Sequence, residues 1–224
     1  MSKSSVLLSV QKASYRYADA EKDEYALKNV SYDFEAGKVY AIRGRSGTGK
    51  TTLLSLITGL ERCREGKIIF DGKDLKDINL DEYRSKDIGI VFQSYNLLPY
   101  MTASENIILS MDASGQKYEN KKEQAIKLME KVGLKSSYAN RKVLRLSGGE
   151  QQRVAIARSL SYNPKMIVAD EPTGNLDKQT ENEILKTFKE LAHKENKCVI
   201  IVTHSANVCK SADIVYDLKK VKEC

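Results

Sequence analysis

A glycine-rich segment of eight residues carries the clearest chemical signal in the chain. Residues 44–51 read GRSGTGKT and fit the pattern G-x-x-x-x-G-K-[ST]. In this pattern backbone N–H groups close around phosphate oxygens, Lys50 can reach the β- and γ-phosphates, and the hydroxyl of Thr51 can bind Mg²⁺. An apolar run precedes the segment and helical apolar spacing follows it, as the strand, loop and helix of this motif require. The segment predicts binding of ATP or GTP rather than a simple helix cap.

Two carboxylates follow a second apolar run. Residues 166–171 read MIVADE, in which we expect a buried strand that ends at Asp170. A carboxylate there can hold Mg²⁺ through water, and Glu171 is then free to orient and polarise an attacking water. Taken alone, the pair is equally well explained as strand-end acids that solvent satisfies.

Two further polar residues close apolar runs, Gln93 after IGIVF and His204 after CVIIVT. Strands of a parallel sheet end at one edge, so these side chains are expected around the same crevice as Asp170 and Glu171. Gln93 could bind Mg²⁺ or the water, and His204 could hydrogen-bond a γ-phosphate and steady Glu171. A strand-end histidine considered alone is more often structural.

A second strong motif is LSGGEQQRVAIARSL at residues 146–160. Ser147 is expected to cap a helix, and Gly148 and Gly149 would leave its first N–H groups open to a ligand such as a terminal phosphate. An ordinary capped helix would explain the serine but not the two glycines, which weaken a first helical turn.

The elements that must position these residues show two kinds of pattern. Alternating or aromatic-rich runs predict antiparallel strands at 6–10, 13–17 and 27–34. Later, apolar strands alternate with helical periodicity, which predicts a parallel sheet covered on both faces. The other expected elements are strands at 67–72, 88–93, 166–170, 198–204 and 213–219, and helices at 119–133, 149–162 and 178–194.

The fold class expected from this order is α/β, with a P-loop NTPase core, an antiparallel β subdomain and an inserted helical lobe. We expect a single domain over 1–224, in which 1–93 and 163–224 form the core with the β subdomain and 94–162 form the helical lobe. No internal repeat is visible, and each motif occurs once.

Length and composition limit the class of protein. With 224 residues, 41% of them hydrophobic, the chain can bury a full core. No stretch approaches the ~20 apolar residues of a membrane helix, and the N-terminus lacks the apolar run of a secretory signal, so we expect a cytosolic protein. Net charge +7 could attract nucleic acid or an anionic membrane, but 37 basic residues are spread among 30 acidic ones, which favours a solvated surface. Scattered cysteines, Cys63, Cys198, Cys209 and Cys224, indicate neither a zinc site nor disulfides.

Together and in this order, the motifs resemble those of the nucleotide-binding subunits of ABC transporters over nearly the whole chain. The matching segments are Walker A at 44–51, the Q-loop at Gln93, LSGGE at 146–150, Walker B at 166–170 with Glu171, the D-loop at 175–177 and the switch histidine His204. The resemblance implies the ABC ATPase architecture, ATP and Mg²⁺ as cofactors, and ATP hydrolysis in which Lys50, Gln93, Glu171 and His204 are catalytic. The implied nucleotide contacts are Tyr17, Gly44, Arg45, Ser46, Gly47, Thr48, Gly49, Lys50, Thr51, Thr52, Ser147, Gly148, Gly149 and Asp177, and the implied Mg²⁺ ligands are Thr51, Gln93 and Asp170.

Narrower features resemble one subgroup of the family and also depart from it. Residues 92–107 and 169–177 are similar to LolD, MacB and FtsE proteins. Glu150 stands where the family commonly has Gln, which is not expected to impair binding, and Ser205 follows the histidine where Asp is frequent, with no effect that the sequence predicts. Tyr17 lies where the family has its adenine-stacking aromatic residue, with Tyr15 as the alternative.

The resemblance also implies partners. In this family the LSGGE helix of one subunit caps ATP held by the phosphate loop of another, so one copy of each motif implies a dimer, either a homodimer or a heterodimer with a related chain. Transmembrane permease subunits and a peripheral position on the cytoplasmic face of the membrane are implied as well. Nucleic acid is not expected as a partner, because relatives of that kind carry two cassettes in one chain or a long coiled-coil insertion.

The expected function is that of an ATP-hydrolysing subunit in an export-type or mechanotransmitting complex that handles peptides, antibiotics or lipoproteins. The alternative is a non-transport regulator that couples ATP state through a membrane partner to a cell-wall hydrolase. Residues 97–101, LLPYM, precede an expected helix start at Thr102 or Ser104. Such an apolar run is often core, but the resemblance places it beside the groove for a cytoplasmic helix of the membrane subunit, where its exposed leucine, tyrosine and methionine side chains would be anchors.

Overall fold

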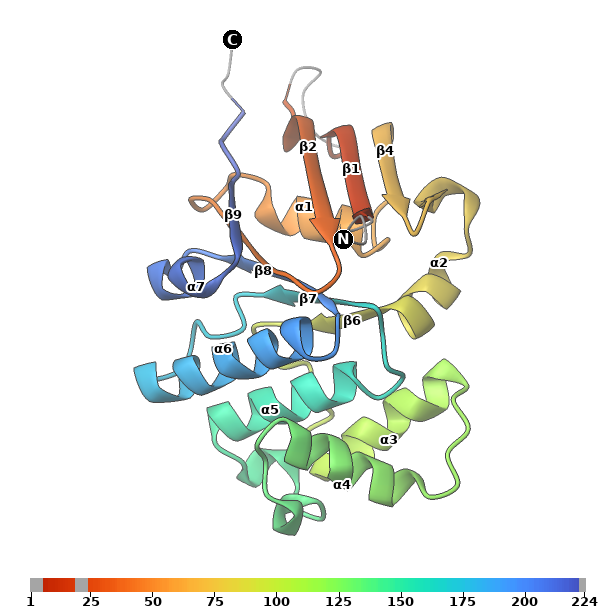
Figure 1. Ribbon diagram of the computed structural model, residues 1–224, viewed down its shortest axis with the longest axis vertical. Coiled ribbons are helices and arrows are strands. Elements are labelled where there is room, and N and C mark those ends of the chain that lie inside the picture. The colour runs from red at the N-terminus through yellow and green to blue at the C-terminus, as the bar shows by residue number, and fades with distance from the viewer. Residues whose placement is uncertain (1–5, 19–23, 222–224) are drawn as a thin grey trace.

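The computed structural model describes residues 6–18 and 24–221, and its elements form three tiers (Figure 1). An antiparallel sheet lies at one end, a parallel sheet in the middle, and a layer of helices at the other end. The first five residues, which belong to the segment searched for a secretory signal, and Cys224 lie outside the described residues.

The middle tier is a five-stranded sheet with strand order β6-β7-β8-β3-β9, in which every neighbouring pair is parallel. Its strands are β3 (Val39–Arg43), β6 (Ile88–Val91), β7 (Met166–Asp170), β8 (Cys198–Thr203) and β9 (Ile214–Asp217). Every residue of β8 is buried, as its unbroken apolar run predicts for a strand covered on both faces. The register pairs Asp170 with Val202 and Arg43 with Thr203, so β3, β7 and β8 end at the same edge.

The parallel sheet separates two hydrophobic cores. Side chains of β3, β7 and β8 alternate between the cores, so that in β8 Ile201 joins one and Ile200 joins the other. The first core is closed by α5 (Gly148–Ser159) and α6 (Lys178–His193), and the second by α1 (Lys50–Ile57) and the antiparallel sheet. Helices α1 and α5 therefore lie on opposite sides of the parallel sheet (Figure 1).

The antiparallel sheet has strand order β2-β1-β4-β5. Its strands are β1 (Val6–Tyr15), β2 (Leu27–Glu35), β4 (Glu65–Phe70) and β5 (Lys73–Asp74). The two strands expected at 6–10 and 13–17 form one strand, β1. An irregularity between Val10 and Ala13, where Lys12 has φ 48°, shifts the alternation of its side chains, which is why the sequence pattern indicated two strands. Arg16 and Tyr17 lie beyond the end of β1, so the strand expected to reach residue 17 is shorter than predicted.

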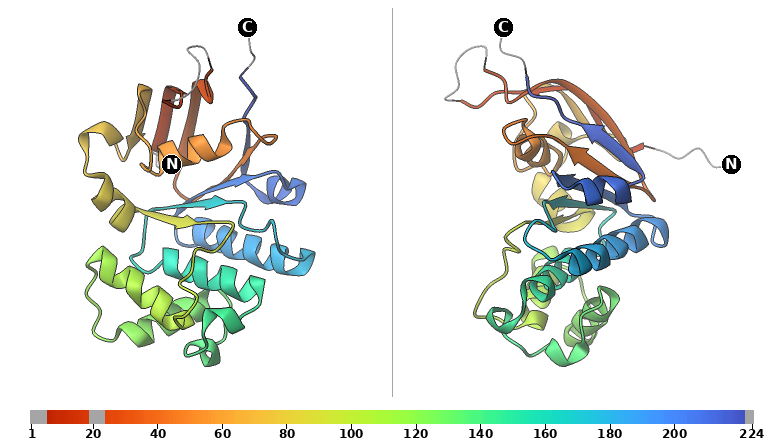
Figure 2. Two further views of the ribbon diagram at one scale, coloured as in Figure 1. Left: turned by 180° about the vertical axis from the view of Figure 1, so that it is seen from behind. Right: turned by 90° about the vertical axis from the view of Figure 1, so that its left-hand side faces the viewer.

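The third tier consists of α3 (Ala103–Ser114), α4 (Lys121–Lys131) and α5, seen from two sides in Figure 2. Thr102 caps α3 and forms a capping box with Glu105. Helix α5 ends before residue 162 because Asn163 is left-handed and precedes Pro164, a position that disfavours helical backbone. Side chains of α3 and α4 share one buried cluster with α6 and the parallel sheet.

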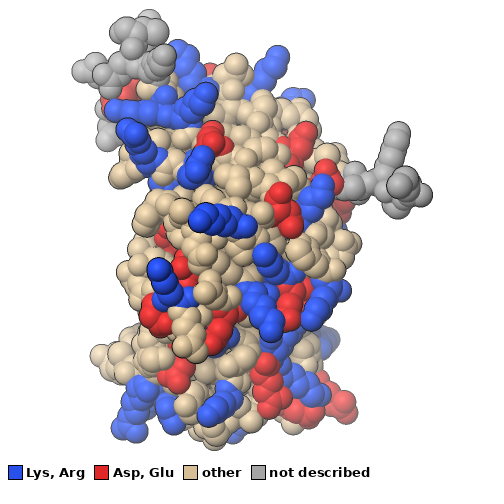
Figure 3. Space-filling view, turned by 60° about the vertical axis from the view of Figure 1, so that its left-hand side comes forward, with Lys and Arg blue, Asp and Glu red and all other residues tan. Residues whose placement is uncertain are grey.

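Short elements complete the fold. They are the 3₁₀ turns η1 (Leu75–Asp77), η3 (Ser136–Tyr138) and η4 (Val143–Arg145), the helices α2 (Leu80–Glu82) and α7 (Ala206–Ser211), and the π-helical turn η2 (Tyr83–Asp87). Across the described ranges, no helix has the length and apolar character needed to cross a membrane. On the face shown in Figure 3, lysine and arginine side chains lie among aspartate and glutamate side chains.

Candidate nucleotide-binding site

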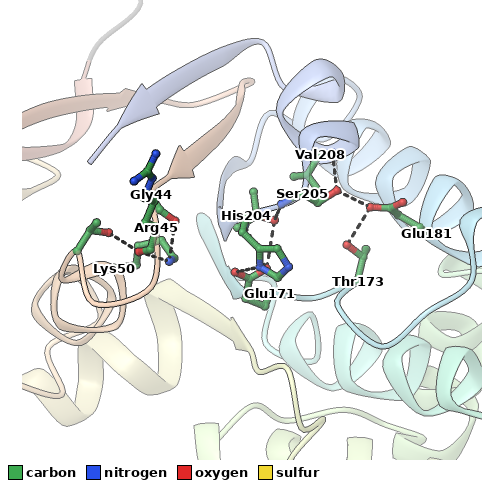
Figure 4. Close-up of polar contacts among 11 residues, drawn as sticks. Gly44, Arg45, Lys50, Glu171, Thr173, Glu181, His204, Ser205 and Val208 are labelled. Atoms are coloured by element: carbon green, nitrogen blue, oxygen red, sulfur yellow. Dashed lines mark hydrogen bonds and ion pairs between the residues drawn. The ribbon is translucent and has the colours of Figure 1, made fainter. Parts of the chain in front are cut away.

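The phosphate loop joins the end of β3 to the start of α1. Lys50 is the first residue of α1, and its Nζ donates hydrogen bonds to the carbonyl oxygens of Gly44 at 2.9 Å and Arg45 at 3.0 Å (Figure 4). The Thr48 hydroxyl donates to the same Arg45 carbonyl at 2.9 Å. The phosphate loop thus curls around the ammonium group of Lys50, which lies beside the first N–H groups of α1. A cation next to free helix N–H groups is suited to binding anions.

Glycines shape the loop in two ways. Gly47 and Gly49 take left-handed conformations, with φ of 74° and 88°. A Cβ atom on Gly49 would lie 2.3 Å from the carbonyl oxygen of Ala26, whereas one on Gly47 would meet nothing within 4 Å. Arg45 and Ser46 are exposed beside Gly47. The base of the loop is therefore fixed by packing, while its rim is open to a ligand.

The threonines of the loop do not all point outward. Thr51 is exposed, but Thr48 and Thr52 are buried, and the Thr52 hydroxyl lies 2.8 Å from the hydroxyl of Tyr17. Of these three, Thr51 is the exposed residue, as expected of a ligand to a bound Mg²⁺. Thr52 can still offer its backbone N–H, because N–H groups in a first helical turn have no partner within the helix.

The geometry distinguishes the two tyrosines considered for adenine stacking. Tyr15 is only 5% exposed and its hydroxyl donates to Glu61 at 2.9 Å. Tyr17 is 46% exposed, and its ring meets that of Tyr15 edge-on at 5.1 Å. Tyr17 therefore has ring surface available for a base, and Tyr15 does not.

Glu171 and His204 lie together where β7 and β8 end (Figure 4). Oε1 of Glu171 lies 2.7 Å from Nδ1 of His204, and Oε2 accepts hydrogen bonds from the Thr203 hydroxyl at 3.2 Å and the His204 N–H at 3.4 Å. The Glu171 side chain is 13% exposed and that of His204 is 70% exposed. Glu171 is also left-handed, with φ 44°, and its N–H donates to Val202. A non-glycine residue in this conformation is often found at a functional site.

Asp170 precedes this pair at the end of β7. Burial raises the pKa of its carboxyl, the Glu171 carboxylate raises the pKa further, and the Lys50 ammonium opposes the shift. Gln93 is exposed two residues beyond β6, and its Nε2 is 3.2 Å from the position of a Cβ on Gly174. The hydrogen bonds of the described residues do not join Gln93 to Asp170 or to Thr51, the other residues predicted to bind Mg²⁺.

The LSGGE segment begins α5 as expected. The Ser147 hydroxyl accepts a hydrogen bond from the Glu150 N–H at 3.3 Å, and the Glu150 carboxylate accepts one from the Ser147 N–H at 2.7 Å, which completes a capping box. Glu150 therefore has a structural role, which the Ser-x-x-Glu spacing of a capping box indicates.

Packing favours both glycines of this segment, in addition to the predicted need to leave room for a ligand. A Cβ on Gly148 would lie 2.9 Å from the Tyr95 hydroxyl, and one on Gly149 would lie 2.6 Å from a methyl carbon of Thr180. The segment lies across the parallel sheet from α1, which the phosphate loop precedes (Figure 1).

Asp177 has a role that the resemblance did not imply. Its carboxylate caps α6 by accepting hydrogen bonds from the N–H groups of Gln179 and Thr180, each at 3.0 Å, and from the Thr180 hydroxyl at 2.6 Å. The hydrogen bonds from Thr180 lower the pKa of Asp177. This side chain, predicted to contact nucleotide, is engaged within the chain.

Three residues beside the Glu171–His204 pair, Ser205, Glu181 and Thr173, had no role predicted from the sequence. Ser205 donates to Glu181 at 2.9 Å, and Thr173 donates to the same carboxylate oxygen at 3.3 Å. Serine directly before a short helix is a local signal for an N-cap, but nothing local connects position 205 to position 181.

Known proteins share this arrangement. The sequence profile of the ABC transporter family matches residues 27–174. YclH of Bacillus subtilis, an uncharacterized ABC transporter ATP-binding protein, is 48% identical over 208 residues, which are 93% of this chain and 91% of YclH. The macrolide export ATP-binding/permease protein MacB of Syntrophobacter fumaroxidans is 40% identical over 211 residues, which are 92% of this chain but 29% of MacB.

Solved structures agree with the sequence matches. The dimeric structure of MJ0796 from Methanocaldococcus jannaschii, an ABC transporter cassette, has a TM-score of 0.87 at 36% identity and covers 96% of this chain and 97% of that chain. A dimeric post-hydrolysis state of the same cassette, bound to ADP and Pi, has a TM-score of 0.87 at 34% identity with the same coverage. With the phosphate loop, the two sheets and the LSGGE helix all in place, the chain belongs to the ABC transporter family as an ATP-binding cassette.

Proposed function

We propose that the chain hydrolyses ATP and that Glu171 orients and polarises the attacking water. The observation that carries this proposal is the placement of Glu171, a mostly buried carboxylate that His204 and Thr203 hold from two sides. A general base must be fixed within reach of one proton, and these contacts fix it. The exposed His204 ring is free to meet a phosphate on its other nitrogen.

The residues around Glu171 fit a nucleotide with Mg²⁺. Lys50 and the start of α1 supply positive charge and N–H groups for phosphates, and Tyr17 supplies an aromatic surface for adenine. Thr51 and Asp170 supply oxygen ligands of the kind Mg²⁺ prefers. Within the described ranges, no three acidic, histidine or cysteine side chains gather into a metal site. When bound, Mg²⁺ would neutralise phosphate charge.

We further propose that two copies share each nucleotide, with the LSGGE helix of one copy facing the phosphate loop of the other. Within one chain, helix α1, which follows the phosphate loop, and helix α5, which begins at the LSGGE segment, pack on opposite sides of the parallel sheet, and the cassettes of similar structure are dimers. The dimer would act with transmembrane subunits at the cytoplasmic face of the membrane. The similarity to a macrolide export protein supports an export-type or mechanotransmitting complex.

The replacement Glu171→Gln tests the catalytic proposal. Because it removes the base but spares the phosphate loop, ATP affinity should stay within about twofold of wild type, while turnover should fall by about 100-fold or more, the usual contribution of a general base. The variant should accumulate as an ATP-bound dimer on gel filtration.

A matched control is Glu190→Gln, which neutralises a carboxylate near the C-terminal end of α6 whose Oε1 forms an ion pair with Lys194. This control should turn over ATP as wild type does. A turnover of Glu171→Gln within about threefold of wild type, a barrier change below ~1 kcal/mol, would remove Glu171 from the role.

A further inference from the structure

A single carboxylate on α6 contacts both segments that carry the Glu171–His204 pair (Figure 4). Ser205, next to His204, donates from its hydroxyl to Oε1 of Glu181 at 2.9 Å. Thr173, two residues after Glu171, donates to the same Oε1 at 3.3 Å. Glu181 thus joins the end of β8 to the segment that follows β7.

Thr203 makes a second connection between the same segments. Its hydroxyl accepts a hydrogen bond from the Ser205 N–H at 2.9 Å and lies 3.2 Å from Oε2 of Glu171, to which it donates. Thr203 is fully buried and Thr173 nearly so, while Glu181 is half-buried. Hydrogen bonds to a carboxylate that is partly withdrawn from water are stronger than neutral ones.

We propose that Glu181 is a positioning residue for ATP hydrolysis, and that with Ser205 and Thr173 it forms a clamp that sets the placement of Glu171 relative to His204. The inference rests on the proposed function, in which Glu171 orients water. Loss of the carboxylate would remove the Ser205 and Thr173 contacts at once and leave the connection through Thr203, so the 2.7 Å contact between the pair would be held less firmly. A misplacement of about 1 Å in a catalytic group can cost roughly 100-fold in rate.

The clamp also gives a physical reason for serine at position 205. Ser205 caps α7, because its hydroxyl accepts a hydrogen bond from the Val208 N–H at 3.4 Å. An aspartate could cap the helix equally well. Its carboxylate would, however, face that of Glu181 at hydrogen-bond distance, where like charges repel. Serine caps the helix and donates to Glu181 at the same time.

Four variants and one control test the clamp. Glu181→Ala removes the acceptor, Glu181→Gln keeps an acceptor oxygen, and Ser205→Asp introduces the opposing charge, alone or with Glu181→Gln. The control is Asn207→Ala, which removes another hydrogen bond between α7 and α6, from Asn207 to Asn182 at 3.0 Å, that contacts neither clamped segment.

The first measurement is the steady-state kinetics of ATP hydrolysis. Glu181→Ala should lower kcat by about tenfold or more and leave the KM for ATP within about twofold, because the binding residues are untouched. Glu181→Gln and Asn207→Ala should stay within about threefold of wild type. Ser205→Asp should be impaired, and adding Glu181→Gln should recover most of its loss, since a glutamine amide can donate to the new aspartate.

The second measurement does not depend on hydrolysis. The sequence has two histidines, His193 and His204, so ¹⁵N shifts of the ring nitrogens can be assigned with a single His193→Gln variant. An ionised Glu171 only accepts hydrogen bonds, so neutral His204 should carry its proton on Nδ1 in the wild type without nucleotide. Glu181→Ala should shift His204 toward the tautomer mixture of free histidine, and Glu181→Gln should not.

The two measurements separate the clamp from the proposed function. Wild-type turnover by Glu171→Gln would remove the function, while the ring shifts still report on the clamp. The clamp is overturned if Glu181→Ala leaves the His204 tautomer as in the wild type. Where Glu171→Gln abolishes turnover, it is also overturned if Glu181→Ala leaves kcat unchanged, or if Ser205→Asp is impaired equally with and without Glu181→Gln. If Glu181→Ala does not fold, Thr173→Val removes one donor isosterically and is judged by the same two readouts.

Discussion

At the scale of single residues, the surroundings of Asp170 disfavour the charged form of its carboxyl group. Burial, together with the neighbouring Glu171 carboxylate, raises the pKa of Asp170 above its ordinary value, against the opposing effect of Lys50. A carboxyl with a higher pKa in the folded chain than in the unfolded chain favours folding when protonated, and this contribution is lost as the pH rises through the folded pKa. Asp170 therefore costs the protein stability at pH values above the ordinary pKa of an aspartate when no nucleotide is bound.

The replacement Asp170→Asn should accordingly raise the melting temperature at pH 7 without nucleotide, by about 2–4 °C if ~1 kcal/mol is recovered. The gain should vanish below pH 3.8, the ordinary pKa of an aspartate. With Mg²⁺ and ATP the wild type should instead melt at the higher temperature, because the variant would lack the carboxylate that we propose as a Mg²⁺ ligand. Thermal unfolding at both pH values, with and without ligand, measures this; a lower melting temperature for the ligand-free variant at pH 7 would contradict it.

Tyr17 allows a test of the adenine contact. Tyr17→Ala should weaken ATP binding by about 1–3 kcal/mol, the usual value of base–aromatic stacking, and leave the melting temperature nearly unchanged. Tyr17→Phe is the matched control, because it removes only the hydroxyl that meets Thr52. Tyr15→Ala should instead lower stability, since that ring is buried. Nucleotide titrations that show weakened binding for Tyr15→Ala but not for Tyr17→Ala would move the contact to Tyr15.

At the scale of elements, the chain illustrates which features leave a local signal. Strand β7 and the start of α5 were predicted from sequence because a buried apolar run and a capping serine depend on neighbouring residues. The irregularity in β1 was missed because one extra residue breaks the period by which a strand is recognised. The Ser205–Glu181 contact was missed because it joins residues that only the tertiary fold brings together.

The loop before α3, residues 97–101, is partly exposed, as a docking surface for a membrane subunit would be. Leu97 packs against the core, whereas Leu98 is 47% exposed and Tyr100 is 80% exposed. Leu98 and Tyr100 are therefore the large apolar side chains of the loop that are available to a partner. Asn106 holds the loop by hydrogen bonds with the N–H and the carbonyl oxygen of Leu98, at 2.8 Å and 3.2 Å. An apolar surface on a fixed loop is suited to receive a partner helix.

Leu98→Asp or Tyr100→Asp should therefore leave the fold and ATP binding intact but release the chain from its membrane subunits, as co-purification in mild detergent would measure. Leu144→Asp is a control, because Leu144 is an apolar residue in η4 whose exposure, 65%, lies between those of Leu98 and Tyr100. Early melting of either loop variant would show that the loop is core, and retention in the complex would place the docking surface elsewhere.

At the scale of the whole molecule, the sheet between the phosphate loop and the LSGGE helix makes two-chain sites testable by mixing. Ser147→Arg should bind ATP as a monomer but not hydrolyse it, because bulk and charge would face the nucleotide of the other copy. Mixed with Lys50→Ala, it should regain activity, since each mixed dimer holds one intact site. Mixing Lys50→Ala with Glu171→Gln should not, because both changes lie on the phosphate-loop half. Full activity of Ser147→Arg alone would contradict the shared site.

The hydrogen bonds of Lys50 to its own loop have a consequence for nucleotide turnover. If Lys50 binds phosphate as we propose, an arriving phosphate would compete with the carbonyl oxygens of Gly44 and Arg45 for its ammonium group. When the phosphate left, the same carbonyl oxygens would again accept hydrogen bonds from Lys50. These internal hydrogen bonds would replace the lost contact and so lower the free-energy cost of releasing the product.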